Sequence, residues 1–438
     1  MTPWLARFLY SALLLALTPF YLLRLWWRGR AEPAYRRRLR ERLGFYRTRR
    51  RAIEGRVVWL HAVSLGETRA AEPLIKALRA QVPGMRLVLT CSTATGLEAG
   101  RALLQDDDIQ TWLPYDTPGA ARRFFRRYRP LVGVLMETEI WPNLMHAAQR
   151  AGVPVVLANA RLSERSQRKG QRLAALLHPA VQQLTWVLAQ TEADARRLRE
   201  AGAPQVEVCG NLKYDIEPPP KLLARGLQWR QQLNDPPRAV VLAASTREGE
   251  EQPLLSAWRA LPAPRPLLLI VPRHPQRFNE VGLLVDNSGF TLSRRSSWAE
   301  GPTPEAARAD VWLGDSMGEM PLYYALADVA LLGGSFAPLG GQNLIEAAAC
   351  GCPMVMGPHT FNFEDAAELS LKAGASLRVA EMADGVRRAA ALAADPQRNQ
   401  WVQNAFGFAA AHRGATGRMA RRIVACAIRG RGDGVGGL

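Results

Sequence analysis

Two series of apolar runs, each run followed by an amphipathic stretch, constrain the fold of this chain more than any other feature. The first series begins at Val57 and consists of VVWLHAV, RLVLTCST, LVGVLME, VPVVLANA and WVLAQT. The second consists of AVVLAAS, PLLLIVPRH, DVWLGD, DVALLGGSF and PMVMGP. Alternation of this kind is typical of βαβ units that build a mostly parallel sheet. The sequence therefore predicts an α/β protein with two doubly wound, Rossmann-like domains that face a cleft.

A stretch bordered by prolines, EPPPKLLARGLQWRQQLNDPPR, separates the two series. Prolines in such clusters indicate a connection between domains. The length of 438 residues also exceeds what one ordinary core accommodates. The predicted parts are, in order, a membrane anchor at 1–30, a basic membrane-proximal segment at 31–55, an N-terminal Rossmann-like domain at 56–225, an interdomain linker at 226–238, a C-terminal Rossmann-like domain at 239–428 and a disordered tail at 429–438.

The amino end carries an apolar stretch at residues 4–27, WLARFLYSALLLALTPFYLLRLWW. This stretch is long enough to cross the hydrocarbon core of a bilayer. A cleaved signal peptide is the alternative, but no small-residue cleavage site follows. The arginine-dense RGRAEPAYRRRLRERLGFYRTRRR follows instead. By the positive-inside rule, the rest of the chain lies in the cytoplasm. The arginine residues either attract an anionic membrane surface or form a solvated helix face.

The net charge of +18 predicts an anionic partner. Nucleic acid, a membrane surface and an acidic substrate all satisfy this condition. A nucleic-acid binder would need a defined module in which basic residues alternate with exposed aromatic residues, and the chain contains none. The five cysteines include no CxxC pair, which favours reduced thiols in a cytosolic compartment.

Charged side chains follow several predicted strands of the first half. Glu67 lies where a predicted strand ends and a predicted helix begins, so it either stabilises the helix N-terminus or belongs to a polar site. Glu137 and Glu139 follow the strand LVGVLME and share a face if the chain is extended there. Lys213 follows the apolar VEVC and is either a surface lysine or a cation for an anionic substrate. Two acidic strand ends in one half of the chain predict a shared polar site.

The second half places cationic and glycine-rich segments after its strands. Arg273 follows a strand, and a guanidinium there suits a phosphate or a carboxylate. The stretch GGSFAPLGGQNLIEAAACGCP ends its glycine-rich loop at Asn343, with Glu346 three residues further on. Glu346 is therefore either part of a capping box or a ligand for sugar hydroxyls. The chain has no GxxxxGK[ST], no strand-linked GxGxxG and no HExxH, which excludes a P-loop and argues against dinucleotide and zincin-type sites.

The chain resembles the GT-B glycosyltransferases. Within them it is similar to the 3-deoxy-D-manno-octulosonic acid (Kdo) transferases that act on the lipid A precursor. The motifs that carry the resemblance occur in the order of that family: HAVSLGE, METEIWPNL, GNLKYD, ASTREGEE, VPRHPQR, GDSMGEM and GGSFAPLGGQNLIEAAACGCPMVMGPHTFNF. The resemblance runs from the anchor to about residue 370 of this chain.

The resemblance implies roles for specific residues. It implies CMP-Kdo as the donor, lipid IVA as the acceptor, and inversion at the transferred carbon. It implies that Glu67 is the general base and that Glu137 and Lys213 stabilise the transition state. The residues that it implies for CMP binding are Pro272, Arg273, Met317, Gly318, Glu319, Asn343, Leu344, Ile345 and Glu346.

The resemblance also assigns the acceptor to the N-terminal domain and CMP-Kdo to the C-terminal one. It implies no metal and no cofactor. It implies the cytoplasmic face of the bacterial inner membrane, where an anionic surface would meet the basic chain. The alternative is a GT-B glycosyltransferase that uses another nucleotide sugar in cell-envelope glycolipid synthesis.

Overall fold

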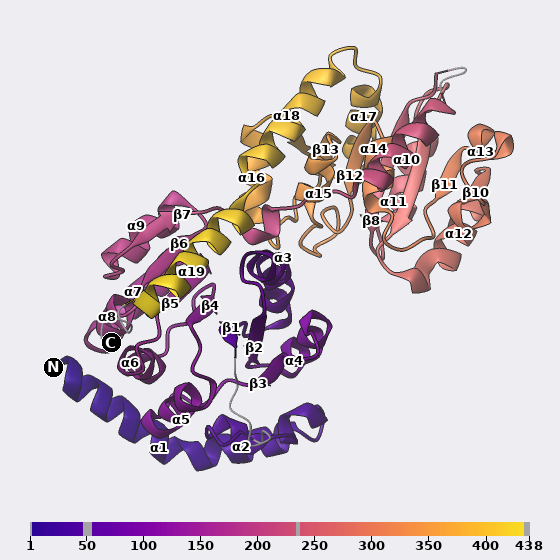
Figure 1. Ribbon diagram of the computed structural model, residues 1–438. Helices are drawn as coiled ribbons and strands as arrows, with labels where there is room; N and C mark the ends of the chain where they lie inside the picture. The colour runs from indigo at the N-terminus through magenta and orange to yellow at the C-terminus, as the bar shows by residue number, and fades with distance from the viewer. Residues whose placement is uncertain (1, 47–54, 234–236, 433–438) are drawn as a thin grey trace. The chain divides into compact units, whose positions relative to one another are not determined.

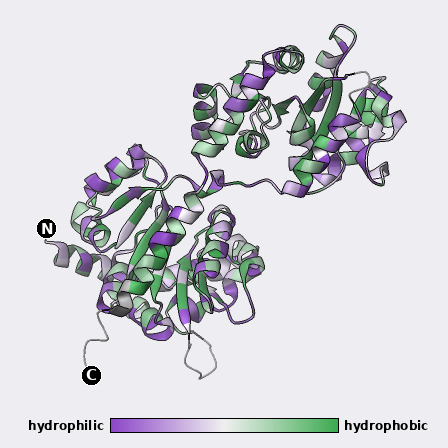
Figure 2. Cartoon of the chain, turned by 45° about the horizontal axis from the view of Figure 1, so that its top comes forward, coloured by the Kyte–Doolittle hydropathy of each residue, from purple (hydrophilic) through white to green (hydrophobic). Residues whose placement is uncertain are grey.

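The computed structural model describes residues 2–46, 55–233 and 237–432. The chain divides into two compact units (Figure 1). Unit 1 comprises Met1–Asp215 and Gly414–Leu438, and unit 2 comprises Ile216–Arg413. In both units the strands are the most hydrophobic elements, whereas many exterior helix residues are hydrophilic (Figure 2).

The strands of unit 1 form, within the described residues, one seven-stranded sheet in the order β3-β2-β1-β4-β5-β6-β7. All of the pairings in this sheet are parallel. The strands are β1 (Arg56–His61), β2 (Met85–Cys91), β3 (Ile109–Trp112), β4 (Val132–Met136), β5 (Val155–Ala160), β6 (Trp186–Ala189) and β7 (Val206–Val208). The helices are α1 (Pro3–Arg28), α2 (Leu39–Arg42), α3 (Leu65–Gln81), α4 (Ala94–Gly100), α5 (Pro118–Tyr128), α6 (Pro142–Arg150), α7 (Glu164–Arg172), α8 (Ala174–Gln182), α9 (Glu192–Glu200) and α19 (Ala415–Gly432), with the short 3-10 turns η1 (Pro33–Arg36), η2 (Arg101–Leu103) and η3 (Leu212–Tyr214).

Central strands of unit 1 are buried on both faces, as a parallel sheet covered by helices requires. Strand β1 shows the pattern: only its first residue, Arg56, is exposed, and Val57 through His61 are buried. One core cluster lies on the face covered by α3 and α19, and the other lies on the face covered by α5, α6 and α8. The continuous apolar runs of the sequence are therefore explained by burial on two sides.

Unit 2 repeats the same arrangement. Within the described residues, its sheet has seven parallel strands in the order β10-β11-β9-β8-β12-β13-β14. The strands are β8 (Val240–Thr246), β9 (Leu267–Pro272), β10 (Leu292–Arg294), β11 (Val311–Leu313), β12 (Val329–Leu332), β13 (Met354–Met356) and β14 (Ser376–Arg378). The helices are α10 (Pro220–Gln231), α11 (Glu251–Arg259), α12 (Phe278–Asn287), α13 (Pro304–Arg308), α14 (Met320–Leu326), α15 (Leu344–Ala349), α16 (Glu364–Lys372), α17 (Met382–Ala393) and α18 (Arg398–Ala411), with η4 (Pro275–Arg277) and η5 (Arg295–Ser297). The predicted fold class, with two doubly wound sheets, is confirmed.

The strand orders fix where a ligand site is expected in each unit. In unit 1 the direction of winding reverses between β1 and β4, and in unit 2 it reverses between β8 and β12. Ligands of open α/β sheets bind outside the carboxyl ends of the strands at such a reversal. The segments after β1, β4, β8 and β12 are therefore the first places to look for a site.

The structure divides the chain at other positions than the sequence predicted. Residues 226–238, predicted as a linker, overlap α10, which belongs to unit 2 and packs against α14. Trp229 of this helix is buried, and Pro220 occupies the first helical position, where the missing N–H costs nothing. The predicted C-terminal domain at 239–428 also extends too far, because α19 packs along α3 of unit 1. The predicted tail at 429–438 begins inside α19, and 433–438 lie outside the described residues.

Helix α1 is long and apolar enough to cross a membrane, judged by length and composition alone. It contacts α6, α8 and η1 of unit 1, and it buries only a few of its side chains, among them Ser11 and Leu25. Its exposed large apolar residues are Trp4, Leu5, Phe8, Leu9, Leu13, Leu15, Leu17, Phe20, Tyr21, Leu23, Trp26 and Trp27. Part of the predicted basic segment at 31–55 forms η1 and α2, and 47–54 lie outside the described residues.

Candidate active site

Glu67 lies in the first turn of α3, directly after β1. Ser64 caps this helix, and the Ser64 hydroxyl accepts a hydrogen bond from the Glu67 N–H at 3.4 Å. The Glu67 carboxylate reaches back and accepts hydrogen bonds from the Val63 N–H at 2.8 Å and the Ser64 hydroxyl at 3.2 Å. This arrangement is close to a capping box, but the backbone N–H that the carboxylate accepts from is that of Val63, one residue before the cap. The helix-stabilising alternative is therefore present in the structure, yet an ionised carboxylate retains further acceptor positions for a substrate proton.

Glu137 and Lys213 meet at the same edge of the sheet. Glu137 follows β4 and has a left-handed backbone with a φ of 60°. Lys213 lies in η3, which follows β7. The Lys213 Nζ donates a hydrogen bond to Glu137 Oε1 at 3.1 Å, and the Glu137 side chain is 16% exposed. The polar site that the sequence predicted from two acidic strand ends thus also includes the lysine.

Electrostatic interactions connect Glu67 with this pair. Burial raises the pKa of Glu67, the charge of Glu137 raises the pKa further, and Lys213 and the local hydrogen bonds oppose this shift. Burial and the charge of Glu67 also raise the pKa of Glu139 to about 6. A carboxylate with a raised pKa is a better proton acceptor at neutral pH.

A network of amide side chains that the sequence analysis did not single out holds Lys213 in place. Asn211 accepts a hydrogen bond from the Lys213 N–H at 2.9 Å and donates one to Gln190 at 2.9 Å. Asn159, at the end of β5, accepts one from the Leu212 N–H at 3.0 Å. Asn159 also has a left-handed φ of 52°, which Asn tolerates better than most residues. The signal available in the sequence was an Asn or Gln at or just after the end of each of three strands, β5, β6 and β7.

An apolar hollow of about 450 Å³ begins beside the acidic segment after β4. Thr138 and Ile140, which flank Glu139, lie at its edge. Its apolar lining consists mainly of Leu157, Leu162, Leu173, Leu177 and Val181. The site of unit 1 therefore combines carboxylates and a cation with an adjacent surface that suits a hydrocarbon chain.

In unit 2, predicted site residues also gather after strands. Pro272 ends β9, and the exposed Arg273 follows it. The charge of Arg273 lowers the pKa of Glu346, but burial of that carboxyl is the larger effect and raises the pKa overall. Arg273 and Glu346 therefore lie close enough to interact, although nearly 75 residues separate them in the chain. The guanidinium of Arg273 is not engaged in any ion pair that the structure describes.

Asn343 caps α15, as the sequence predicted, but the capping box with Glu346 is not formed. The Asn343 side chain accepts a hydrogen bond from the Ile345 N–H at 3.1 Å. No described hydrogen bond involves the Glu346 carboxylate, so this side chain is available to a ligand. Leu344 and Ile345 are buried in the core, and only their backbone atoms can contact a nucleotide.

Glu319 has a different environment from the one that the sequence suggested. Its carboxylate accepts hydrogen bonds from Arg295 at 3.0 and 3.1 Å and from the Ser316 hydroxyl at 2.6 Å. Burial raises the pKa of Glu319, but Ser316 and Arg295 together outweigh burial and hold the pKa below its usual value. The carboxylate thus fixes the loop, whereas Met317 and Gly318 are exposed at the loop tip.

The buried carboxylate of Glu250 accepts hydrogen bonds from the glycine-rich loop after β12. It is 2% exposed and lies after β8, at the winding reversal of unit 2. One oxygen accepts hydrogen bonds from the N–H groups of Arg247 and Gly334 at 2.9 and 2.8 Å, and the other from Phe336 and Ala337 at 3.1 and 3.2 Å. The loop after β12 is therefore tied to the loop after β8. Sequence reasoning did not assign this role, although Glu250 follows an apolar strand as Glu67 and Glu137 do.

Two Rossmann-like units, each with polar residues gathered after the strands, make up the GT-B fold, and this chain belongs to that fold class. The UDP-GlcNAc 2-epimerase of Neisseria meningitidis has this fold; it is 15% identical to this chain, covers 85% of it and 100% of its own length, and gives a TM-score of 0.51.

Sequence relatives identify the family within this class. The family described as 3-Deoxy-D-manno-octulosonic-acid transferase (kdotransferase) matches residues 37–216. The 3-deoxy-D-manno-octulosonic acid transferase of Bordetella pertussis is 45% identical over 424 residues, which cover 94% of this chain and 97% of the relative. The Haemophilus influenzae protein of the same name is 37% identical over 387 residues, which cover 87% and 89%. The chain belongs to the 3-deoxy-D-manno-octulosonic acid transferase family, and the predicted family and enzyme class are confirmed.

Proposed function

We propose that the chain transfers Kdo from CMP-Kdo to lipid IVA, the lipid A precursor, with inversion at the transferred carbon. The proximity of Glu67 to the Glu137–Lys213 pair at the winding reversal of unit 1 is the observation that carries this proposal. Membership of the family supports the sugar that is transferred.

Glu67 serves as the general base in this proposal. An acceptor hydroxyl oxygen attacks the anomeric carbon of Kdo, and its proton passes to the Glu67 carboxylate. The bond between that carbon and the CMP phosphate breaks, and the electron pair leaves with CMP. A general base contributes roughly 10²–10⁴-fold to the rate of such a step. The hydrogen bonds from Val63 and Ser64 keep the carboxylate in one orientation.

Glu137 and Lys213 stabilise the charges that develop during transfer. The reacting sugar gains oxocarbenium character, which a carboxylate such as Glu137 offsets. Lys213 offsets the carboxylate of the donor sugar or the departing phosphate. The ion pair between the two side chains holds both in place before the substrates bind.

Unit 2 binds the CMP moiety in this proposal. Arg273 is exposed and free of a described ion pair, and Glu346 nearby has no described hydrogen bond. Together they offer a cation for phosphate and a carboxyl for sugar hydroxyls. Pro272, Asn343, Leu344 and Ile345 contribute mainly backbone groups, and Met317, Gly318 and Glu319 form a loop at the same edge of the sheet.

The acceptor is a lipid that carries two phosphates, and it is presented at the cytoplasmic face of the bacterial inner membrane. Helix α1, with its exposed apolar residues, and the arginine-rich segment after it support attachment to that surface. The hollow beside Thr138 and Ile140 supports an acceptor that carries hydrocarbon chains.

Purified protein in detergent should be assayed with lipid IVA and either CMP-Kdo or UDP-sugars, and the product mass measured. A mass increase of one or more Kdo residues with CMP-Kdo alone is expected. Transfer from a UDP-sugar, with none from CMP-Kdo, would instead support the alternative of a different nucleotide-sugar donor.

A further inference from the structure

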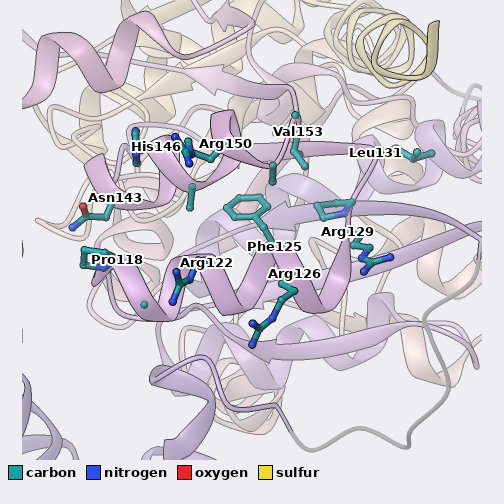
Figure 3. A pocket seen from close by; sticks show the side chains of 15 residues that line it. Pro118, Arg122, Phe125, Arg126, Arg129, Leu131, Asn143, His146, Arg150 and Val153 are labelled. Atoms are coloured by element: carbon teal, nitrogen blue, oxygen red, sulfur yellow. The ribbon is translucent and has the colours of Figure 1, made fainter. Parts of the chain in front are cut away.

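A groove of about 830 Å³ runs between α5 and α6 of unit 1 (Figure 3). Phe125 of α5 lines the groove between the two helices, whereas His146 and Arg150 line it from α6. The groove extends along both helices to Leu131 and Val153, which lie at the amino ends of β4 and β5. Its other end, at Pro118 and Asn143, lies at the starts of α5 and α6, but none of the residues of the polar site lines it.

The ionisable side chains that line this groove are all basic. Its ionisable lining residues are Arg122, Arg126, Arg129, Arg150 and His146. The lining contains no Asp or Glu, and none of the four arginine residues takes part in an ion pair or a side-chain hydrogen bond that the structure describes. All four are exposed. Arginine residues that are not neutralised by the protein bind phosphate well, because the guanidinium offers several donors in a fixed geometry.

The groove lies next to the apolar helix α1. The Ser11 hydroxyl of α1 donates a hydrogen bond of 3.1 Å to the side chain of Asn143, which lines the groove. Burial lowers the pKa of His146, and the charges of Arg7 in α1 and Arg150 lower it further, so Arg7 lies near the groove as well. Asp116 fixes the start of α6 by accepting hydrogen bonds from the Asn143 and Leu144 N–H groups at 3.0 and 2.6 Å. The basic groove and the apolar helix are thus held together as one surface of unit 1.

We propose that the groove between α5 and α6 binds the phosphate headgroup of an anionic phospholipid while α1 is inserted among the neighbouring acyl chains. A bilayer presents acyl chains and phosphates side by side, which matches an apolar helix beside an arginine-lined groove. The proposal deepens the membrane attachment that the proposed function assumes, but it assigns the lipid to a site separate from the residues that carry out transfer.

The test measures how strongly the full chain partitions onto vesicles with and without anionic lipid, and compares the two partition coefficients as a ratio. Binding is measured to vesicles of phosphatidylcholine alone and to vesicles that also contain about 20% phosphatidylglycerol. Helix α1 contributes to binding in both cases, so the ratio isolates the contribution of the anionic lipid. The groove variant carries Arg122→Gln, Arg126→Gln and Arg150→Gln. The control variant carries Arg165→Gln, Arg172→Gln and Arg196→Gln, which remove the same charge from exposed positions of α7 and α9 outside the groove.

We expect the ratio of the groove variant to fall at least about tenfold below that of the control, because each basic residue at an anionic surface contributes about 1 kcal/mol. Equal ratios for the two variants would overturn the proposal, because they would show only a diffuse attraction. A further variant, Ala147→Trp, fills the groove without changing the charge. It should lower the ratio too, and an unchanged ratio would also overturn the proposal, even if the triple variant did not fold.

This measurement uses neither donor nor acceptor. Its outcome is therefore independent of the transfer assay, and a failure of the proposed function would be recognised separately, by the absence of a Kdo-containing product in detergent.

Discussion

The ammonium nitrogen of Lys213 lies 3.1 Å from Oε1 of Glu137, although the two residues are 76 positions apart in the chain. The contact arises because β4 and β7 are parallel strands of one sheet, so the segments after both strands emerge at the same edge. Lys213 is 42% exposed, and an ion pair at such a position contributes at most about 1 kcal/mol to stability. The pair therefore adds little to the stability of the fold, and its proposed role is to stabilise charge during transfer.

Replacing the lysine should separate these two effects. We expect Lys213→Ala to lower turnover by roughly tenfold or more, because the transition state loses a charged hydrogen bond of about 1.5–3 kcal/mol. The thermal midpoint should change little. Lys76→Ala removes a lysine from an exposed pair with Glu72 on α3 and serves as the control. Equal turnover in the two variants would remove Lys213 from the catalytic site.

Glu250 should be essential for the conformation of the glycine-rich loop after β12, although its side chain need not touch the donor. Glu250→Ala leaves four N–H groups without their buried acceptor, so we expect a loss of at least about 3 kcal/mol in the free energy of unfolding. The apparent affinity for CMP-Kdo, measured by calorimetry at a temperature where the variant is folded, should fall as well. The control is Glu248→Ala, because Glu248 is an exposed neighbour in the same loop. A normal affinity and a normal thermal midpoint for Glu250→Ala would contradict this role.

Arg273 should act in binding the donor more than in the chemical step. Arg273→Ala removes an exposed guanidinium after β9, and the lost charged hydrogen bond should weaken CMP-Kdo binding by about 1.5–3 kcal/mol. Saturating donor should largely restore the rate. Arg388→Ala, on an exposed face of α17, removes the same charge elsewhere in unit 2 and is expected to bind the donor normally. If both variants bind CMP-Kdo as tightly as the unaltered protein, Arg273 lies outside the donor site.

Glu139 should make the stability of the protein depend on pH in a defined direction. Its pKa is raised from 4.5 to about 6, with burial as the main cause. Between these values the folded state binds more protons than the unfolded state, so the contribution of Glu139 to stability falls as the pH rises through this range. Urea unfolding of Glu139→Gln should therefore show a gain over the unaltered protein that is larger at about pH 7 than at about pH 4.5. A gain that does not change with pH would show that the pKa is not raised.

The sequence allowed the fold class, and the positions of charged residues after strands, to be predicted because both depend on short-range patterns. Buried parallel strands are continuous apolar runs, and Glu67, Glu137, Lys213 and Arg273 each follow such a run. The short edge strands β3, β10 and β14 were missed because IQTW, LSR and SLR are partly exposed and carry no apolar run.

The domain boundary was missed because it depends on tertiary contacts. Nothing local in α19 indicates that it returns to α3, and the prolines before α10 start a helix as readily as they end a domain. The hydrogen bonds of Glu250 to the N–H groups of Gly334, Phe336 and Ala337 likewise depend on the approach of two loops 84 to 87 residues apart, which no spacing in the sequence reveals.

Glu67 provides the most direct test of the whole account. Its raised pKa suits a proton acceptor, and its capping contacts give a competing structural explanation for the same side chain. Glu67→Gln retains the size and some of the hydrogen bonding but cannot take a proton. The decisive measurement is the initial rate of Kdo transfer from CMP-Kdo to lipid IVA by this variant, with its thermal midpoint recorded on the same sample. We predict a loss of roughly 10²–10⁴-fold in rate with a midpoint close to that of the unaltered protein; a stable variant that transfers Kdo at the normal rate would contradict the account.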